Sequence, residues 1–217
     1  MKNCRGIIFD FDFTLADSSK GVEECVNYAL KKLGFKEGSI DKIKETIGLT
    51  LEQTLTYLVG EQHIDKSERF KFYFIERADE IMADFTDLFT ETPRVLKLLH
   101  KKGLKLGIVS TKFRYRIETI LSRENLRDLF DVIIGGEDVP KLKPDPFGLI
   151  SAVKKLNLSS SEVLYVGDSI IDAETASRAN IHFIAIVTGV TTHKEFAQFQ
   201  VDNFIENLSD LPKLILK

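Results

Sequence analysis

The chain has 217 residues, 43% hydrophobic and 29% charged, with a formal net charge of −3. These proportions are ordinary for a globular protein and exclude disorder, collagen and a disulfide scaffold as descriptions of the whole chain. The length fits one or two domains of roughly 100–200 residues each. Nucleic-acid binders usually gather an excess of Lys and Arg on one face, and this composition has none, so we expect no nucleic-acid partner.

No segment of the sequence predicts a membrane anchor. A stretch around residues 180–193 lacks Asp, Glu, Lys and Arg, but it holds several polar residues and is shorter than the about 20 apolar residues that a spanning helix needs. Acidic residues interrupt the apolar run near the N-terminus at once, which is not typical of a signal peptide. The two cysteines, Cys4 and Cys25, lack metal-ligand spacing, and we expect reduced thiols in a cytoplasmic protein.

The first half of the chain begins with a strand and continues as helices. Consecutive apolar residues predict a short buried strand over residues 2–9. A helix capped by Ser18 or Ser19 follows and ends at Gly34, and a second, short helix ends at Gly48. Thr50 and the Gln three residues later form a capping box for a third helix. A fourth helix is predicted from about residue 65 to residue 85.

From residue 92 onward, predicted strands alternate with helices. Thr92 and Pro93 begin a helix as its cap and first residue, and Gly103 ends it. Strands follow over 104–109, 131–134, 163–166 and 182–187, with helices over 113–124, 147–156 and 170–179 and a closing helix or turn over 208–215. This alternation indicates a three-layer, Rossmann-like α/β core, in which helices cover both faces of a parallel sheet.

The spacing of the first two strands of this series predicts an inserted domain. They end near residues 10 and 110, whereas a βαβ unit needs only about 30 residues or slightly more. The residues beyond this length coincide with the helical stretch described above. We therefore predict a discontinuous α/β core over 1–16 and 88–217 and an all-helical domain over 17–87.

Polar residues follow four of the predicted strands. In open parallel sheets, ligands bind outside the carboxyl ends of the strands, so these positions are candidates for one site. The candidates are Asp10, Asp12 and Thr14 after the first strand, Ser110 and Thr111 after the second, Lys141 and Lys143 after the third, and Asp168 and Asp172 after the fourth.

This set of side chains fits phosphoryl transfer. Carboxylates gathered at one edge disfavour each other's ionisation, and a divalent cation relieves the repulsion. Oxygen ligands without His or Cys favour a hard ion, above all Mg²⁺, which also binds substrate phosphate. One carboxylate can attack phosphorus while a second protonates the leaving oxygen and then activates water. Each cluster alone also fits a capped surface turn, so the prediction depends on finding all four together.

Two segments carry a resemblance to a known family. DFDFTL at 10–15 and VGDSIIDAETASRAN at 166–180 resemble the haloacid dehalogenase-like hydrolases. More narrowly, they resemble its phosphatases with a helical cap between the first two motifs, a group that contains phosphoglycolate phosphatase-like enzymes. The resemblance extends over essentially the whole chain and implies that residues 17–87 form such a cap.

The resemblance implies catalytic roles. Asp10 would be the nucleophile that becomes phosphorylated, and Asp12 the general acid and base. Ser110 would bind the phosphoryl group and Lys143 would bridge it to the nucleophile, with Lys141 as a less favoured alternative because it does not precede a proline. Thr14 would brace the loop of the nucleophile, and this residue and Thr111 complete the phosphate-binding candidates.

The resemblance also implies a metal site. The Asp10 carboxylate, the Asp12 backbone carbonyl and the Asp168 carboxylate would hold Mg²⁺, and Asp172 would support the site from behind these ligands or through water. Dehalogenases lack an acid at the place of Asp12, because a halide leaves without a proton. The presence of Asp12 therefore favours phosphate-ester or phosphoanhydride chemistry.

One position departs from the family pattern. Phe13 stands where glycine is usual, and its ring would narrow the leaving-group space or pack on the cap. Candidates for substrate contact within the cap are Thr46, Gly48 and Gln53, although their positions at predicted helix boundaries account for them equally well.

The sequence thus predicts a cytoplasmic, Mg²⁺-dependent phosphatase, monomeric or homodimeric, that acts on a small phosphorylated metabolite. By resemblance, phosphoglycolate, pyrophosphate and sugar phosphates are the substrates to consider. A phosphomutase of the same family and a non-enzymatic phospho-acceptor or binding protein are the alternatives. No membrane partner is expected.

Overall fold

The computed structural model describes residues 4–216, which form two compact units. One unit, here the α/β unit, contains Met1–Ala16 and Leu88–Lys217, and the other, the helical unit, contains Asp17–Asp87. The chain passes between the units twice, through β2 (Ala16–Asp17) and β3 (Asp87–Leu88), which pair as a two-stranded sheet. No helix within residues 4–216 is long and apolar enough to span a membrane.

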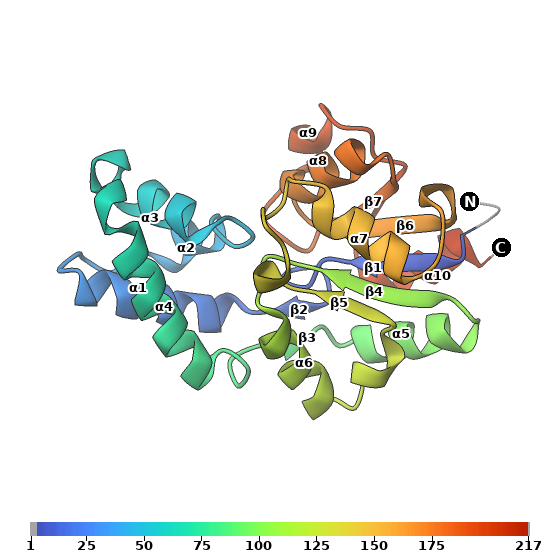
Figure 1. Ribbon diagram of the computed structural model, residues 1–217, viewed down its shortest axis with the longest axis horizontal. Coiled ribbons are helices and arrows are strands. Elements are labelled where there is room, and N and C mark those ends of the chain that lie inside the picture. The colour runs from blue at the N-terminus through green and yellow to red at the C-terminus, as the bar shows by residue number, and fades with distance from the viewer. Residues whose placement is uncertain (1–3, 217) are drawn as a thin grey trace. The chain divides into compact units, whose positions relative to one another are not determined.

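The α/β unit is built on one sheet of six strands in the order β5-β4-β1-β6-β7-β8, and every pairing is parallel (Figure 1). This arrangement confirms the predicted α/β class. The sixth strand was not predicted, because it is only three residues long and polar residues precede it. The strands are β1 (Gly6–Phe9), β4 (Lys105–Val109), β5 (Val132–Ile134), β6 (Val163–Gly167), β7 (His182–Ile186) and β8 (Asn203–Ile205).

Helices cover both faces of this sheet. Figure 1 shows α7 (Phe147–Lys155) and α8 (Ile170–Ala179) on one side and α5 (Thr92–Lys101) and α6 (Arg114–Arg123) on the other. Fully buried side chains such as Ile8, Leu149 and Tyr165 belong to one core cluster. Short helices complete the unit: α9 (His193–Phe196), α10 (Leu211–Ile215) and 3₁₀ turns at Arg127–Leu129, Gly136–Asp138, Ser160–Glu162 and Leu208–Asp210.

The helical unit has a core of its own. Its helices are α1 (Ser19–Lys32), α2 (Ile40–Lys44), α3 (Leu51–Val59) and α4 (Ser67–Ile81), with a 3₁₀ turn at Glu61–Lys66. Helices α1 and α4 pack along each other and bury residues that include Cys25, Leu30, Phe70 and Phe74. Helices α2 and α4 are both shorter than the periodicity predicts, because turns extend from their ends.

The predicted helix starts differ in how they are capped. The capping box of Thr50 and Gln53 is present at α3, with both reciprocal hydrogen bonds. Ser18 occupies the cap position of α1, but its side chain makes no capping bond. Residues 2 and 3 of the first predicted strand lie outside the described residues, and β1 begins at Gly6.

Thr92 was predicted to cap α5, and this prediction is wrong. Thr92 is the first residue of the helix, and Glu91 occupies the cap position. The buried Thr92 hydroxyl donates instead to the Leu15 carbonyl oxygen, at 2.8 Å. The backbone N–H of Phe89 donates to the same carbonyl, at 3.1 Å. These two hydrogen bonds hold the segment before the chain leaves the α/β unit against the segment after it re-enters that unit.

Replacing Thr92 with Val should lower the free energy of unfolding by about 1 kcal/mol, the usual loss for one buried hydrogen bond. The loss stays modest because the Leu15 carbonyl keeps its bond from Phe89. Denaturant unfolding of the variant measures it. Thr119→Val is the matched control, because that exposed hydroxyl bonds only within its own helix. Equal loss in the two variants would contradict an anchoring role for Thr92.

Candidate active site

The carboxyl edge of the sheet brings the predicted residues together around β1. Strand β1 lies between β4 and β6, with Phe9 paired to both Ile108 and Val166. The next residue, Asp10, donates its backbone N–H to the Val166 carbonyl, at 2.9 Å. Ser110 and Asp168 follow the neighbouring strands directly. Strand order also reverses at β1, and ligands bind at such switch points in open α/β sheets.

Lys143 joins two of the acidic residues. Its Nζ lies 2.9 Å from Asp10 Oδ1 and 2.6 Å from Asp172 Oδ1. It also donates to the Tyr165 hydroxyl, at 3.2 Å. Burial acts to lower the pKa of Lys143, but the charges of Asp10 and Asp172 together raise that pKa above its ordinary value. The ammonium is therefore charged when it faces Asp10.

Burial and neighbouring negative charges raise the pKa values of Asp10 and Asp168. Burial raises the pKa of Asp10 to about 6, the Lys143 ammonium opposes this, and the charges of Asp172 and Asp12 add to it. Burial, followed by the charges of Asp172 and Asp10, raises the pKa of Asp168 well above its ordinary value. The site is thus short of positive charge.

This donor set fits a hard divalent cation. Asp10, Asp168 and Asp172 are buried, and each has a carboxylate oxygen within 4.8 Å of the others. Neither His nor Cys belongs to this group, which favours Mg²⁺ over softer metals.

The hydrogen bonds of Asp172 separate it from the other two acids. Its Oδ1 accepts from Lys143 and Tyr165, and its Oδ2 accepts from the backbone N–H and hydroxyl of Ser169. Asp168, in contrast, accepts from the Thr14 hydroxyl at 3.3 Å. Asp10 and Asp168 therefore have more lone pairs free for a cation than Asp172, whose supporting role stays a prediction.

Sequence reasoning missed two residues at this site, Lys112 and Tyr165. Lys112 Nζ lies 2.9 Å from Asp12 Oδ1 and 3.2 Å from Asp12 Oδ2. Tyr165 donates its hydroxyl to Asp172 Oδ1 at 2.7 Å and to the Val109 carbonyl at 3.3 Å. The available signals were a Lys two residues after Ser110 and a tyrosine inside a buried strand, whose hydroxyl needs a partner.

The loop after β1 is held in a conformation that suits glycine. Phe13 has φ 57°, in the left-handed region that side chains with a Cβ disfavour. Its N–H donates to the Ala16 carbonyl at 2.7 Å, and its own carbonyl accepts from the Thr188 hydroxyl. The backbone geometry thus gives a physical reason why glycine is usual at this position.

The remaining sequence candidates have these surroundings. Thr111 is half-buried, whereas Lys141 is exposed in the loop that carries the buried Lys143. Thr46 donates its hydroxyl to the Ile43 carbonyl at 2.7 Å, and Gly48 has φ 95°. Gln53 is exposed and takes part in the capping box of α3. Substrate contact by Thr46, Gly48 and Gln53 stays a prediction.

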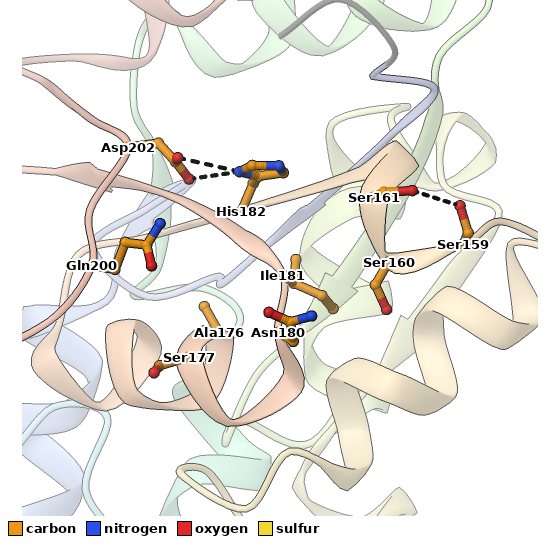
Figure 2. A pocket seen from close by; sticks show the side chains of 10 residues that line it. All are labelled: Ser159, Ser160, Ser161, Ala176, Ser177, Asn180, Ile181, His182, Gln200 and Asp202. Atoms are coloured by element: carbon orange, nitrogen blue, oxygen red, sulfur yellow. Dashed lines mark hydrogen bonds and ion pairs between the residues drawn. The ribbon is translucent and has the colours of Figure 1, made fainter.

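A cavity of about 540 Å³ lies at the other edge of the sheet, near the amino ends of β6 and β7. Figure 2 shows its lining, in which the His182 ring faces Asp202, with Nδ1 3.1 Å from Oδ2. None of the lining residues is Lys or Arg. Without a cation to meet phosphate, this cavity is a poorer candidate than the acidic edge.

Comparisons with known proteins agree with this choice. A family model described as haloacid dehalogenase-like hydrolase matches residues 7–186. Phosphoglycolate phosphatase from Aquifex aeolicus is 31% identical, over 97% of this chain and 96% of its own length. The enzyme of the same name from Cereibacter sphaeroides is 30% identical, over 97% of both chains.

Solved structures give the same match. A Bacteroides fragilis protein assigned as a haloacid dehalogenase-like hydrolase is 42% identical, with a TM-score of 0.92 over 96% of this chain and 99% of that one. A Lactobacillus plantarum protein assigned as a phosphoglycolate phosphatase is 26% identical, with a TM-score of 0.86 over 99% of this chain and 100% of that one.

Mg²⁺ should raise the melting temperature of the metal-free protein, because it relieves the repulsion between Asp10 and Asp168. The folded-state pKa of Asp10, about 6, exceeds its ordinary value of 3.8. The folded state therefore binds more protons between these values, so this group increases stability as pH falls through 6. Protons also compete with Mg²⁺ there, and the Mg²⁺-induced shift should shrink. Thermal unfolding with Mg²⁺ or EDTA across this pH range measures both effects.

Asp168→Asn should raise the melting temperature of the metal-free protein, since one repelling carboxylate is lost, and should remove the response to Mg²⁺. Asp128→Asn, which changes an exposed acid, is the control and should behave as wild type. A full Mg²⁺ response in Asp168→Asn would show that this carboxylate holds no metal.

Proposed function

Because the chain belongs to the haloacid dehalogenase-like hydrolase family and is a phosphoric monoester hydrolase, we propose that it is a Mg²⁺-dependent phosphatase acting through an aspartyl-phosphate. The observation that carries this proposal is the placement of Asp10, with Lys143 2.9 Å away and Asp168 in the same carboxylate group. A buried carboxylate beside a fixed ammonium is suited to attack phosphorus, because the ammonium also attracts the phosphoryl oxygens.

Asp10, Asp168 and the backbone carbonyl of Asp12 would hold Mg²⁺. Bound there, the ion would neutralise the carboxylates and the phosphoryl charge that otherwise repel each other. The buried Ser110 hydroxyl accepts from the Lys112 N–H at 3.3 Å, which leaves its own proton free to donate to a phosphoryl oxygen.

The reaction divides into two displacements. In the first, an Asp10 carboxylate oxygen forms a bond to phosphorus, the bond from phosphorus to the leaving oxygen breaks, and Asp12 gives that oxygen its proton. In the second, Asp12 takes a proton from water, the water oxygen bonds to phosphorus, and the bond to Asp10 breaks. Inorganic phosphate leaves, Asp10 is again a free carboxylate, and Asp12 again carries the proton with which it began.

The substrate we propose is a small phosphorylated metabolite. Phosphoglycolate has the support of the relatives' names, while pyrophosphate and sugar phosphates rest on the resemblance alone. We assign the helical unit the role of a cap that selects the substrate. No observation favours a mutase or a phospho-acceptor. The cytoplasmic location and the oligomeric state stay predictions.

Phosphate release from p-nitrophenyl phosphate tests the proposal. Wild type should be active with Mg²⁺ and inactive in EDTA. Asp10→Asn should lose activity by at least about three orders of magnitude, as other enzymes do when they lose a covalent nucleophile. Lys143→Met should be similarly impaired, whereas Lys141→Met, an exposed residue of the same loop, should stay active. Wild-type activity in Asp10→Asn would overturn the mechanism.

Removing the Phe13 ring should shift selectivity toward bulky leaving groups. Phe13→Ala and Phe13→Gly should both raise the ratio of kcat/KM for p-nitrophenyl phosphate to that for phosphoglycolate, since both remove a buried ring. The glycine variant should be about 1 kcal/mol more stable than the alanine variant, because only alanine keeps the penalty of positive φ. An unchanged ratio in both variants would remove Phe13 from substrate selection.

A further inference from the structure

The ion pair between Lys112 and Asp12 has no place in the mechanism given above. Only 5% of the Lys112 side chain and 10% of the Asp12 side chain are exposed. The ammonium lies within 3.2 Å of both carboxylate oxygens. Burying such a pair rarely adds net stability, because desolvation of the two charges offsets their attraction. A role in orienting Asp12 therefore explains the pair better than a contribution to folding.

The backbone of Lys112 is fixed on both sides. Its N–H donates to Ser110 Oγ at 3.3 Å, and its carbonyl accepts from the Gly136 N–H at 3.1 Å. A side chain attached to the end of β4 thus reaches from a held backbone to the loop after β1. Contact with both oxygens of Asp12 fixes the rotation of that carboxylate as well as its position.

Each of the two lysines pairs with one of the two acids in the loop after β1. Lys143 pairs with Asp10 and Lys112 pairs with Asp12. With a lysine of its own, Asp12 is not drawn toward the ammonium that the nucleophile uses. The arrangement keeps two carboxylates that are two residues apart in separate places, as separate roles require.

We propose that Lys112 is a positioning residue, which holds the Asp12 side chain where it meets the leaving oxygen of the substrate. Each Asp12 oxygen keeps a lone pair beyond its contact with Lys112, and one of these lone pairs carries the proton that is transferred. This inference rests on the proposed function, since it takes Asp12 as the general acid. Lys112 acts through Asp12 and is not assigned any contact with the phosphoryl group.

The dependence of the rate on the leaving group distinguishes this role from a structural one. An alkoxide is a poor leaving group and needs a proton, so a misplaced acid slows alkyl phosphates strongly. The p-nitrophenolate ion leaves without a proton. The second displacement, in which Asp12 acts as the base, is common to both substrates. The comparison therefore uses kcat/KM, which reports only the steps up to departure of the leaving group. A merely structural defect would lower kcat/KM for both substrates to the same extent.

The experiment measures kcat and KM for ethyl phosphate and p-nitrophenyl phosphate, with Mg²⁺ present. The proteins are wild type, Lys112→Met, Lys112→Arg, Asp12→Asn and the double variant Asp12→Asn/Lys112→Met. Lys101→Met, at an exposed position on α5, is the matched control and should behave as wild type. The melting temperature of each variant is recorded with Mg²⁺.

Asp12→Asn should lower kcat/KM for ethyl phosphate by about 100-fold or more, within the usual range for a general acid. Lys112→Met should lower it by at least about tenfold, with kcat/KM for p-nitrophenyl phosphate reduced less than about threefold. The double variant should be no slower than Asp12→Asn, because both changes remove one function. Lys112→Arg, which keeps the ion pair, should recover part of the ethyl phosphate rate.

Equal losses of kcat/KM on the two substrates in Lys112→Met would overturn the proposal while the selective defect of Asp12→Asn left the mechanism intact. Equal losses in Asp12→Asn would instead overturn the acid role of Asp12, and the positioning role with it. If Lys112→Met fails to fold, its unpaired buried carboxylate explains that, and the double variant and Lys112→Arg decide. A double variant much slower than Asp12→Asn, or equal losses of kcat/KM on the two substrates in Lys112→Arg, would reject positioning.

Discussion

The excess of buried negative charge beside β1 governs the arrangement of this site. Asp10, Asp12, Asp168 and Asp172 are all buried, and Lys112 and Lys143 are the ammonium groups paired with them. When all are ionised, the carboxylates exceed the ammonium groups. Such a cluster would be costly in water-free surroundings unless a cation or bound protons compensated it. The raised pKa values of Asp10 and Asp168 express the same imbalance.

The scaffold makes this imbalance tolerable by fixing the groups around it. Asp172 is held by two hydrogen bonds on each oxygen, from Lys143, Tyr165 and Ser169, so it orients Lys143 while keeping little capacity for a metal. Phe13 adds backbone strain in the same loop. A strained residue and repelling charges persist only where the surrounding structure holds them in place. Here the buried sheet holds them.

The sequence predicts most of this arrangement because parallel strands end at one edge. Runs of apolar residues placed Asp10, Ser110 and Asp168 at predicted strand ends, and the register of β1 with β4 and β6 then brings those ends together. The partners of Lys112 and Tyr165 could not be predicted in this way. Lys112 reaches the loop after β1, whereas the Tyr165 hydroxyl meets Val109 on β4 and Asp172 on α8, and these contacts depend on register and rotamer. The predicted capping role of Thr92 was wrong for the same reason, because its hydrogen-bond partner, Leu15, is distant in sequence.

The chemical groups and the proposed substrate-selecting groups belong to separately packed units. All residues with a proposed catalytic role lie in the α/β unit, whose core cluster contains no residue of the segment 17–87. The helical unit buries its own side chains around α1 and α4. Substitutions inside one core therefore need not disturb the other, because packing defects act mainly on their neighbours. Phe13 is the exception, since this proposed determinant of selectivity lies in the loop of the nucleophile itself. The backbone strain at Phe13 destabilises the α/β unit, which performs the chemistry. A change of substrate selectivity at this position therefore also changes the loop that carries the nucleophile.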